Sequence, residues 1–566
     1  MRTSRFFSIL LLAPISFLQA QSPSGDIRLN QAGFYPAAPK MAVVTGQTFM
    51  VRRAGDMAVV FRGAAGAAQR SAYSGRESRV ADFSALQDTG SFVLEVPGAG
   101  TSGVFVIRPA VHAPLVVAAL KGFYYQRTAT ELTKAYAGPW SRPAGHPDTA
   151  VLVHPSAAGP KRVSGTVISS PGGWYDAGDY NKYIVNCGIT MGTLLSLYED
   201  HPAYCRQLRT GIPESGNALP DLLDEILFNL RWMLTMQDPD DGGVYHKLTN
   251  AAFDGTVMPH EARKPRYVVQ KSTAAALDFA AVTAQAARVF ASFPDELPGL
   301  ADSCVQAAER AWQWAVQHPE IYYDQQKINR HSDPDISTGG YGDRNVRDEF
   351  AWAGAELFIT TKKEQYRPEM PMPLQIPTWS QVRWLGCYRV LRSGYATDSL
   401  KRELEQWAGD RVKQAAQNPY RTVMGASARD FVWGSNAVAA NQGIALLYAY
   451  RISGNKSYLH HALANLDYLL GRNATGYSFV TGIGTRTPMH PHHRPSQADG
   501  ITAPVPGLLA GGPNPGRQDG CKYPSAAADE AYTDDDCSYA SNEIAINWNA
   551  PLVYLAAALE ALEEEF

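Results

Sequence analysis

The clearest indication of the fold class of this chain is the stretch Pro220-Asp-Leu-Leu-Asp-Glu-Ile-Leu-Phe-Asn-Leu-Arg-Trp-Met-Leu-Thr-Met236. Pro220 stands where a first helical turn would begin, a position that proline favours. The apolar side chains that follow recur at intervals of three and four residues, which places them on one face of a helix: Leu223, Ile226, Leu227, Leu230, Met233 and Leu234. The stretch therefore predicts a helix that packs one face on a core.

Similar spacing recurs after residue 113 and predicts about eleven helices in all. Many of these segments carry alanine on both sides, as expected of helices packed between neighbouring helices. Together they predict one large, mainly α domain over residues 111–566. The long intervals 238–271 and 472–547 are predicted to be functional loops. The other predicted helices cover Leu115–Leu132, Asn186–Tyr198, 272–290, 299–317, 347–361, 380–393, 398–416, 436–453, 456–471 and 548–564.

The segment before this domain alternates short apolar runs with turn residues. The runs Met41–Val44, Val59–Arg62 and Phe92–Val96 are separated by stretches rich in glycine, serine and aspartate. Regular short strands between turns are typical of a small sandwich. We therefore expect an immunoglobulin-like β-sandwich over residues 21–110, without the cysteine and tryptophan hallmark of antibody domains.

Residues 1–20 have the parts of a secretory signal peptide. Arg2 and Arg5 supply positive charge, an apolar run follows, and Leu18-Gln-Ala20 provides a cleavage site. The mature protein is therefore predicted to be exported, to the periplasm, the cell surface or the medium. No later stretch reaches 18 consecutive apolar residues, so no membrane-spanning helix is expected.

The composition excludes several classes of function. With a net charge of −3, the chain lacks the excess of positive charge that binding to nucleic acid or an anionic membrane requires. Six cysteines are too few and too scattered for a disulfide scaffold. Cys521 and Cys537 flank one polar loop and are the predicted disulfide, which an oxidising compartment permits. The sequence leaves the oligomeric state open.

Two candidate catalytic acids lie in the ten residues Pro171-Gly-Gly-Trp-Tyr-Asp-Ala-Gly-Asp-Tyr180. The glycines predict a tight, irregular loop on which Asp176 and Asp179 point into one small volume. The alternative is a turn whose carboxylates cap backbone N–H groups or hold a cation. Neighbouring aromatic rings offer faces on which a sugar ring could stack: Trp174, Tyr175 and Tyr180.

A third acid, Glu543, stands directly before a predicted apolar helix, close in sequence to Tyr539 and Trp548. A charged carboxylate in such surroundings loses hydration, so its pKa rises toward that of a general acid. The alternative is that Asn542 and Glu543 are helix-start residues favoured by capping and the macrodipole. A proton donor facing an acid pair is what glycoside hydrolysis requires.

Three separated stretches together resemble the motifs of glycoside hydrolase family 9, the inverting β-1,4-glucanases. They are Asp176–Tyr180, the pair Ser478–Arg486 and Pro491–Arg494, and Tyr532–Glu543 continued by Asn549-Ala550. The opening Ile27–Phe34 resembles the immunoglobulin-like module of one branch of that family. The resemblance covers nearly the whole mature chain. It implies an (α/α)6 barrel preceded by a small β-sandwich.

The resemblance also implies a role for each matching residue. Asp179 would be the general base, Asp176 would help to hold the attacking water, and Glu543 would be the general acid. An inverting enzyme keeps its two acids roughly 6.5–9.5 Å apart to admit water, which acids on separate loops can do. The residues implied to bind the substrate are His492, Arg494, Tyr539 and Trp433.

No cofactor is required by this chemistry, and no metal ligand is assigned. The resemblance raises one metal site, because the family branch with the immunoglobulin-like module often carries a zinc ion bound by cysteines and histidines. Here Thr128 and Gly145 stand where cysteines would. We therefore expect this zinc site to be lost, although His146 remains. Three histidines in and beside the second motif have no cysteine or acid at a ligand spacing, and Arg494 next to them would repel a cation: His490, His492 and His493.

Calcium is a further alternative that the resemblance raises. The segment Gly339–Asp343 with Asp348 and Glu349 resembles the calcium cluster of the family, although Ser380-Gln381 replaces an acid expected further on. Asp348 and Glu349 would equally serve as the acidic first turn of a helix.

The expected function is endo-acting, inverting hydrolysis of β-1,4-glucosidic bonds in a cellulose-like, mixed-linkage or xyloglucan polysaccharide. An exo-acting cellodextrinase or a glucosaminidase of the same fold are alternatives, as is a catalytically dead carbohydrate-binding protein, which the presence of all three acids disfavours. The immunoglobulin-like module is expected to be a structural prop. Four residues of the long loop 238–271 are candidates for a wall of the substrate path: Tyr245, His246, His260 and Tyr267.

Overall fold

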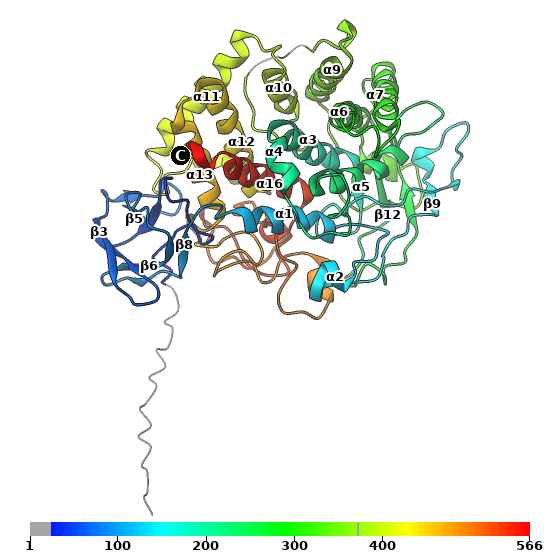
Figure 1. Ribbon diagram of the computed structural model, residues 1–566. Coiled ribbons are helices and arrows are strands. Elements are labelled where there is room, and N and C mark those ends of the chain that lie inside the picture. The colour runs from blue at the N-terminus through cyan, green and yellow to red at the C-terminus, as the bar shows by residue number, and fades with distance from the viewer. Residues whose placement is uncertain (1–23, 369, 371–372) are drawn as a thin grey trace, which may run out of the picture.

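The computed structural model describes residues 24–368, 370 and 373–566. The predicted signal peptide, residues 1–20, lies outside the described residues. Figure 1 shows a small β domain in blue beside a larger helical domain. The predicted fold class, a β-sandwich followed by a mainly α domain with the (α/α)6 architecture, is confirmed.

The β domain consists of two antiparallel sheets whose inward side chains form their own core. The aromatic rings of Phe34, Phe83 and Phe105 meet there, with Phe34 edge-on to both others. The predicted runs lie in β1, β3 and β6. One sheet has the order β1 (Met41–Val44), β5 (Glu77–Asp82), β4 (Gln69–Arg70), and the other β3 (Val59–Ala64), β2 (Thr48–Arg53), β6 (Gly90–Val96), β7 (Gly100–Thr101), with β8 (Phe105–Ile107) also on β6.

Buried polar contacts join the sandwich to the helical domain. The Tyr35 hydroxyl donates to Glu560 Oε1 at 2.7 Å, and Asn30 Nδ2 donates to Asp467 Oδ1 at 2.7 Å. The Tyr35 ring also stacks on Phe566 at 5.6 Å. Since these side chains are buried against the other domain, the sandwich is packed on the barrel rather than tethered by a free linker.

All the predicted long helices are present, with ends that differ by a few residues. The first differs most, since it is predicted to reach Leu132 and ends at Tyr125. Just beyond that end, the backbone of Arg127 forms a β-bridge with Trp174 of the loop Pro171–Tyr180, which we call the acid loop. The long helices are α1 (Ala113–Tyr125), α3 (Ile184–Asp200), α5 (Asp221–Thr235), α6 (Thr273–Phe290), α7 (Leu300–Gln317), α9 (Arg347–Thr361), α10 (Arg383–Arg392), α11 (Asp398–Ala415), α12 (Ser435–Ser453), α13 (Lys456–Leu469) and α16 (Ile546–Ala561).

Burial separates inner from outer helices. Nearly every residue of α3, α6 and α16 is buried, and α3 packs against both of the others. In α7 and α11, by contrast, buried residues recur at helical spacing on one face. The short helices are α2 (Lys134–Ala137), α4 (Pro202–Gln207), α8 (Gln325–Asn329), α14 (Arg494–Ala498) and α15 (Tyr539–Asn542).

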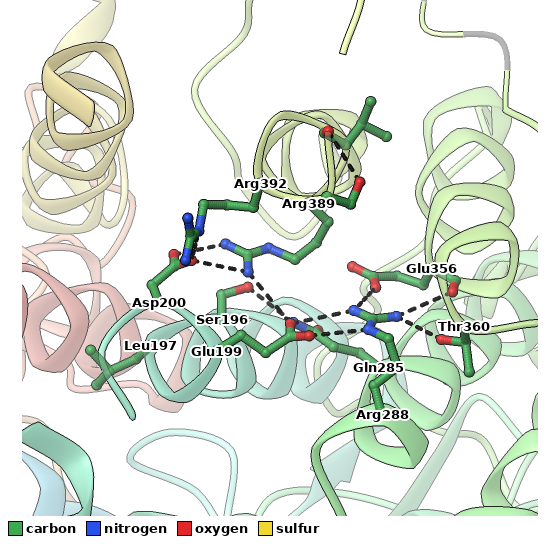
Figure 2. A network of polar contacts seen from close by, with 12 residues as sticks. Ser196, Leu197, Glu199, Asp200, Gln285, Arg288, Glu356, Thr360, Arg389 and Arg392 are labelled. Carbon is green, nitrogen blue, oxygen red and sulfur yellow. Dashed lines mark hydrogen bonds and ion pairs between the residues drawn. The ribbon is translucent and has the colours of Figure 1, made fainter. Parts of the chain in front are cut away.

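The two ends of α3 contact different parts of the molecule. The acid loop enters its N-terminal end, and at its C-terminal end Glu199 and Asp200 bind arginines of neighbouring helices (Figure 2). Glu199 pairs with Arg288 of α6, and Asp200 pairs with Arg389 of α10 at 2.8 Å. Seventeen helical residues span about 25 Å. The ion network therefore ties the barrel helices together far from the acid loop.

A five-stranded sheet inside the helical domain was not predicted. Its order is β10 (Val167–Ile168), β9 (Val151–Val153), β13 (Arg266–Val268), β12 (Lys247–Asn250), β11 (Lys182–Tyr183). Strands of two to four residues are too short to show an alternating pattern, and β12 is buried at every position. Since β11 joins the acid loop to α3, this sheet holds the loop in place.

Candidate active site

The segment Pro171–Tyr180 is an irregular loop, as its glycines predicted. Gly172 and Gly173 have φ angles of 78° and 81°, which other residues adopt at a cost. A Cβ atom on Gly178 would lie 2.1 Å from the carbonyl oxygen of His492. Only glycine lets the loop approach the His492 segment so closely.

The aromatic rings of this loop are buried supports. Trp174, Tyr175 and Tyr180 are each at most 1% exposed, so the expectation that a sugar stacks on them is wrong. The Trp174 ring packs on Phe123, and its Nε1–H donates to Glu225. Buried rings that reach into the core anchor the loop instead of facing a substrate.

Asp176 is 2% exposed and held from two sides. Asn186 of α3 donates to its Oδ1 at 2.7 Å, and the Tyr341 hydroxyl donates to its Oδ2 at 2.7 Å. Burial, and then the negative charge of Asp179, raise the pKa of Asp176. Asp176 is therefore fixed in place by two hydrogen-bond donors while its charged form is disfavoured.

Asp179 is 6% exposed and receives two hydrogen bonds on one oxygen. Asn181 Nδ2 donates to its Oδ2 at 2.5 Å and the Tyr183 hydroxyl donates to the same atom at 3.2 Å. The Tyr183 oxygen in turn accepts from the Gly339 N–H at 3.1 Å. The segment 339–341 therefore reaches both acids, through Tyr341 and through Tyr183.

Glu543 follows α15 and lies beside the acid pair. Its backbone pairs with His492, and three residues later the Ile546 N–H donates to the Asp176 carbonyl oxygen at 2.9 Å. Burial, followed by the charges of Asp179 and Asp176, raises the pKa of Glu543 well above its ordinary value. The structure thus brings together the three acids that were predicted from remote parts of the sequence.

Arg494 holds the acid loop by its backbone. Its Nη1 donates to the Gly178 carbonyl oxygen at 2.8 Å, and its Nε donates to the Asp254 carbonyl oxygen at 2.9 Å. The positive charge also opposes the rise in the pKa of Glu543. Arg494 therefore positions the acids, and its expected contact with a sugar hydroxyl stays a prediction.

A row of rings leads away from the acids. The His492 ring lies 5.9 Å from Tyr539, which lies 5.4 Å from Trp433, and the Trp433 side chain is 43% exposed. His492 Nδ1 contacts the Asp536 carbonyl oxygen at 2.7 Å. Such a partly exposed row offers faces on which successive sugar rings can stack. The structure therefore groups the three aromatic residues predicted to bind substrate.

Two residues at the site were missed by sequence reasoning. Tyr341 lies in a glycine-rich segment that was interpreted as part of a calcium cluster, so its hydrogen bond to Asp176 was not predicted. Phe253 is 42% exposed with the Arg494 guanidinium 5.5 Å from its ring. In the same long loop Tyr245 and His246 are buried, so the expectation that they form a wall of the substrate path is wrong.

The residues at the former zinc position do not fit zinc. A Cβ atom on Gly145 would lie 2.5 Å from the Pro259 Cβ, which leaves no room for a side chain there. The Thr128 hydroxyl donates to the Gly172 carbonyl oxygen, and His146 Nδ1 contacts the Tyr175 hydroxyl at 2.8 Å. The hydroxyl of Thr128 and one ring nitrogen of His146 are thus engaged by other protein groups.

A second cluster of acids lies at the start of α9. Burial, followed by the charges of Asp348 and Asp343, raises the pKa of Asp278 of α6 well above its ordinary value. Burial, followed by the charge of Asp278, does the same for Glu349. Both carboxylate oxygens of Asp278 and of Glu349 are buried without a hydrogen-bond partner. Asp348 and Glu349 form the acidic first turn of α9, as one of the two alternatives predicted, and calcium binding stays a prediction.

Two further expectations concern covalent structure and membranes. The predicted disulfide between Cys521 and Cys537 is present. The other four cysteines are buried and free. Among the described residues, no helix combines the length and the apolar character needed to cross a membrane.

Known proteins are similar to this chain in sequence. Residues 113–556 match the family model described as Glycosyl hydrolase family 9, and residues 22–101 match that described as Cellulase N-terminal ig-like domain. The chain is 50% identical over 556 residues to a xyloglucan-specific endo-beta-1,4-glucanase of Bacteroides ovatus, covering 95% of this chain and 94% of the relative. It is 33% identical over 554 residues to endoglucanase D of Acetivibrio thermocellus, covering 94% and 83%.

Solved structures agree with these matches. A Bacteroides ovatus GH9 structure superposes with a TM-score of 0.91 at 48% identity, covering 96% of this chain and 100% of that chain. A metagenome-derived family 9 endoglucanase superposes with a TM-score of 0.86 at 34% identity, covering 95% and 99%.

Proposed function

Since the chain belongs to glycosyl hydrolase family 9, and is thus a glycoside hydrolase of the endoglucanase kind, we propose that it cleaves the β-1,4-glucan backbone of xyloglucan by endo attack with inversion. The observation that carries the mechanism is the meeting of Glu543 with Asp176 and Asp179. The choice of xyloglucan rests on the relative of 50% identity that is specific for it.

The proposed reaction divides the work among the three acids. Glu543, kept protonated by its raised pKa, gives its proton to the glycosidic oxygen as the C–O bond breaks. Asp179 takes a proton from a water molecule whose oxygen forms the new bond to the anomeric carbon. Asp176 helps to hold that water. Attack from the face opposite the leaving group inverts the configuration.

The remaining predicted site residues are proposed to bind the glucan. Trp433 and Tyr539 would stack on sugar rings beside the acids, since their rings are partly exposed and adjacent. His492 and Arg494 would bind hydroxyl groups at the cleavage point, and Arg494 also holds Gly178.

Product analysis on a panel of polysaccharides tests this function. We expect the fastest hydrolysis on xyloglucan, early release of mixed long oligosaccharides, and an α-anomer as the first product seen by NMR. Release of single small products from chain ends would identify an exo-acting enzyme. A β-anomer as the first product would contradict inversion, because a retaining enzyme forms it through a covalent intermediate.

We also propose that the cluster of Asp278, Asp343, Asp348 and Glu349 binds calcium for stability. Carboxylate oxygens are the ligands calcium prefers, and here several lack any other partner. Calcium at about 100 times its dissociation constant should stabilise the fold by about 2.7 kcal/mol, seen as a rise in Tm over chelated protein.

Variants identify the site of that effect. Asp278→Asn should remove most of the calcium-dependent rise in Tm. Asp224→Asn is the matched control, since Asp224 also has a buried oxygen without a partner but lies outside the cluster. An equal calcium-dependent rise in Asp278→Asn and wild type would contradict the assignment.

Export is proposed from the N-terminal sequence and the disulfide. An oxidising compartment permits the Cys521–Cys537 bond. Fractionation of expressing cells should find the mature chain beginning near Gln21 outside the cytoplasm.

A further inference from the structure

Two adjacent residues of the unpredicted sheet bind the segment that touches both catalytic aspartates. Lys247, the first residue of β12, is 0% exposed, and His246 before it is 1% exposed. The Lys247 Nζ donates to the Gly339 carbonyl oxygen at 2.6 Å, and His246 Nε2 contacts the Gly340 carbonyl oxygen at 2.8 Å. His246 and Lys247, which are adjacent in sequence, thus bind the carbonyl groups of the adjacent residues Gly340 and Gly339.

The chemistry of each side chain suits this task. Lys247 Nζ donates to the Gly339 carbonyl, Thr338 Oγ1 and Gln325 Oε1. Burial lowers the pKa of Lys247 to about 7, and the negative charge of Asp179 opposes that fall. Within the described residues Lys247 forms no ion pair with a carboxylate. Burial lowers the pKa of His246 to about 3, so its neutral ring donates from Nε2 to Gly340 and accepts at Nδ1 from Ser272.

The held segment reaches the aspartates by two routes. The Gly339 N–H donates to the Tyr183 hydroxyl, which donates to Asp179. The Tyr341 hydroxyl donates to Asp176. Tyr341 has a φ angle of 46°, a conformation that non-glycine residues adopt at a cost, so contacts on either side must maintain it.

We propose that Lys247 is a positioning residue for catalysis: with His246 it holds the carbonyl groups of Gly339 and Gly340 and thereby sets Tyr341 on Asp176 and Tyr183 on Asp179. This inference rests on the proposed roles of the two aspartates. Small displacements of catalytic groups cost up to about 100-fold in rate. The expected signature is a loss in kcat at nearly unchanged KM.

The test compares two buried lysines. Lys247→Met should lower kcat about 10- to 100-fold and change KM less than about threefold. Lys40→Met is the matched control, because Lys40 in the sandwich is also 0% exposed and donates to three acceptors, the carbonyl groups of Tyr35, Pro36 and Ala38. It should lose stability and keep kcat. Equal kcat in both folded variants would overturn the inference.

A double-mutant cycle with Tyr341→Phe distinguishes an effect of Lys247 that acts through Tyr341 from a nonspecific loss of active-site structure. If Lys247 acts through Tyr341, the double variant should be no slower than the slower single variant. Losses that simply multiply would overturn the inference. Should Lys247→Met not fold, His246→Ala supplies the same cycle, because it releases the Gly340 carbonyl while Lys247 keeps its contact with Gly339.

The outcome is distinguishable from failure of the proposed function. Full activity in Asp179→Ala would refute the proposed roles of the aspartates themselves. An inactive Asp179→Ala together with a fully active Lys247→Met would leave those roles intact and refute only the positioning role.

Discussion

Replacement of Glu543 by alanine is expected to reduce kcat on a β-1,4-glucan by about 10²- to 10⁴-fold with the fold intact. A sugar leaving group departs as a poor alkoxide unless it receives a proton, and Glu543 is the acid whose burial and negative neighbours keep it protonated. Wild-type activity should fall as the pH rises above that raised pKa, because the proton is then lost. This decline at high pH should disappear from the variant.

The leaving group provides the sharper measurement. An aryl cellobioside that releases an acidic dinitrophenol needs no proton, so Glu543→Ala should lose less than about tenfold on it. Glu309→Ala, which removes a carboxylate from the outer helix α7, should leave both rates unchanged. An equal loss of Glu543→Ala on both substrates would show that this residue is not the general acid.

Asp179→Ala is expected to lose a similar factor for a different reason. Without a base, the attacking water keeps its proton and is a weak nucleophile. Azide is already an anion and needs no base, so added azide should restore much of the activity on the dinitrophenyl substrate. The product should be the α-glycosyl azide, formed by attack from the water side.

The same experiment contains its own control. Azide should not restore hydrolysis of the glucan by Glu543→Ala, whose defect lies in the leaving group. A β-glycosyl azide from Asp179→Ala would instead place the empty volume on the other face of the sugar. Near-normal turnover of the glucan by Asp179→Ala without azide would refute the assignment of the base.

Local sequence patterns predicted much of this molecule because they reflect local physics. Helical spacing of apolar residues identified α3, α5 and α6, since a buried face requires that spacing whatever its partner. The glycines of Pro171–Tyr180 identified a loop, because Gly172 and Gly173 take φ angles that favour glycine.

Patterns failed where partners come from elsewhere in the chain. The rings of Trp174 and Tyr180 looked available for a sugar but are buried by residues distant in sequence. Strand β12 is polar and short, so nothing in its own composition predicts a place in a buried sheet. In the sequence Asp278 is one acid in an alanine-rich helix, and only the fold brings it into electrostatic contact with Glu349.

The helices, the sandwich before them and the three candidate acids were predictable from the chain alone, because periodicity, turn chemistry and motifs are read along it. The groups that surround those acids became known only from the folded molecule. Tyr341 meets Asp176 from 165 residues away, and Lys247 holds that segment from a strand no pattern marked. Electrostatics and hydrogen bonds act through space, so their effect on each acid follows from folded distances rather than from order along the chain.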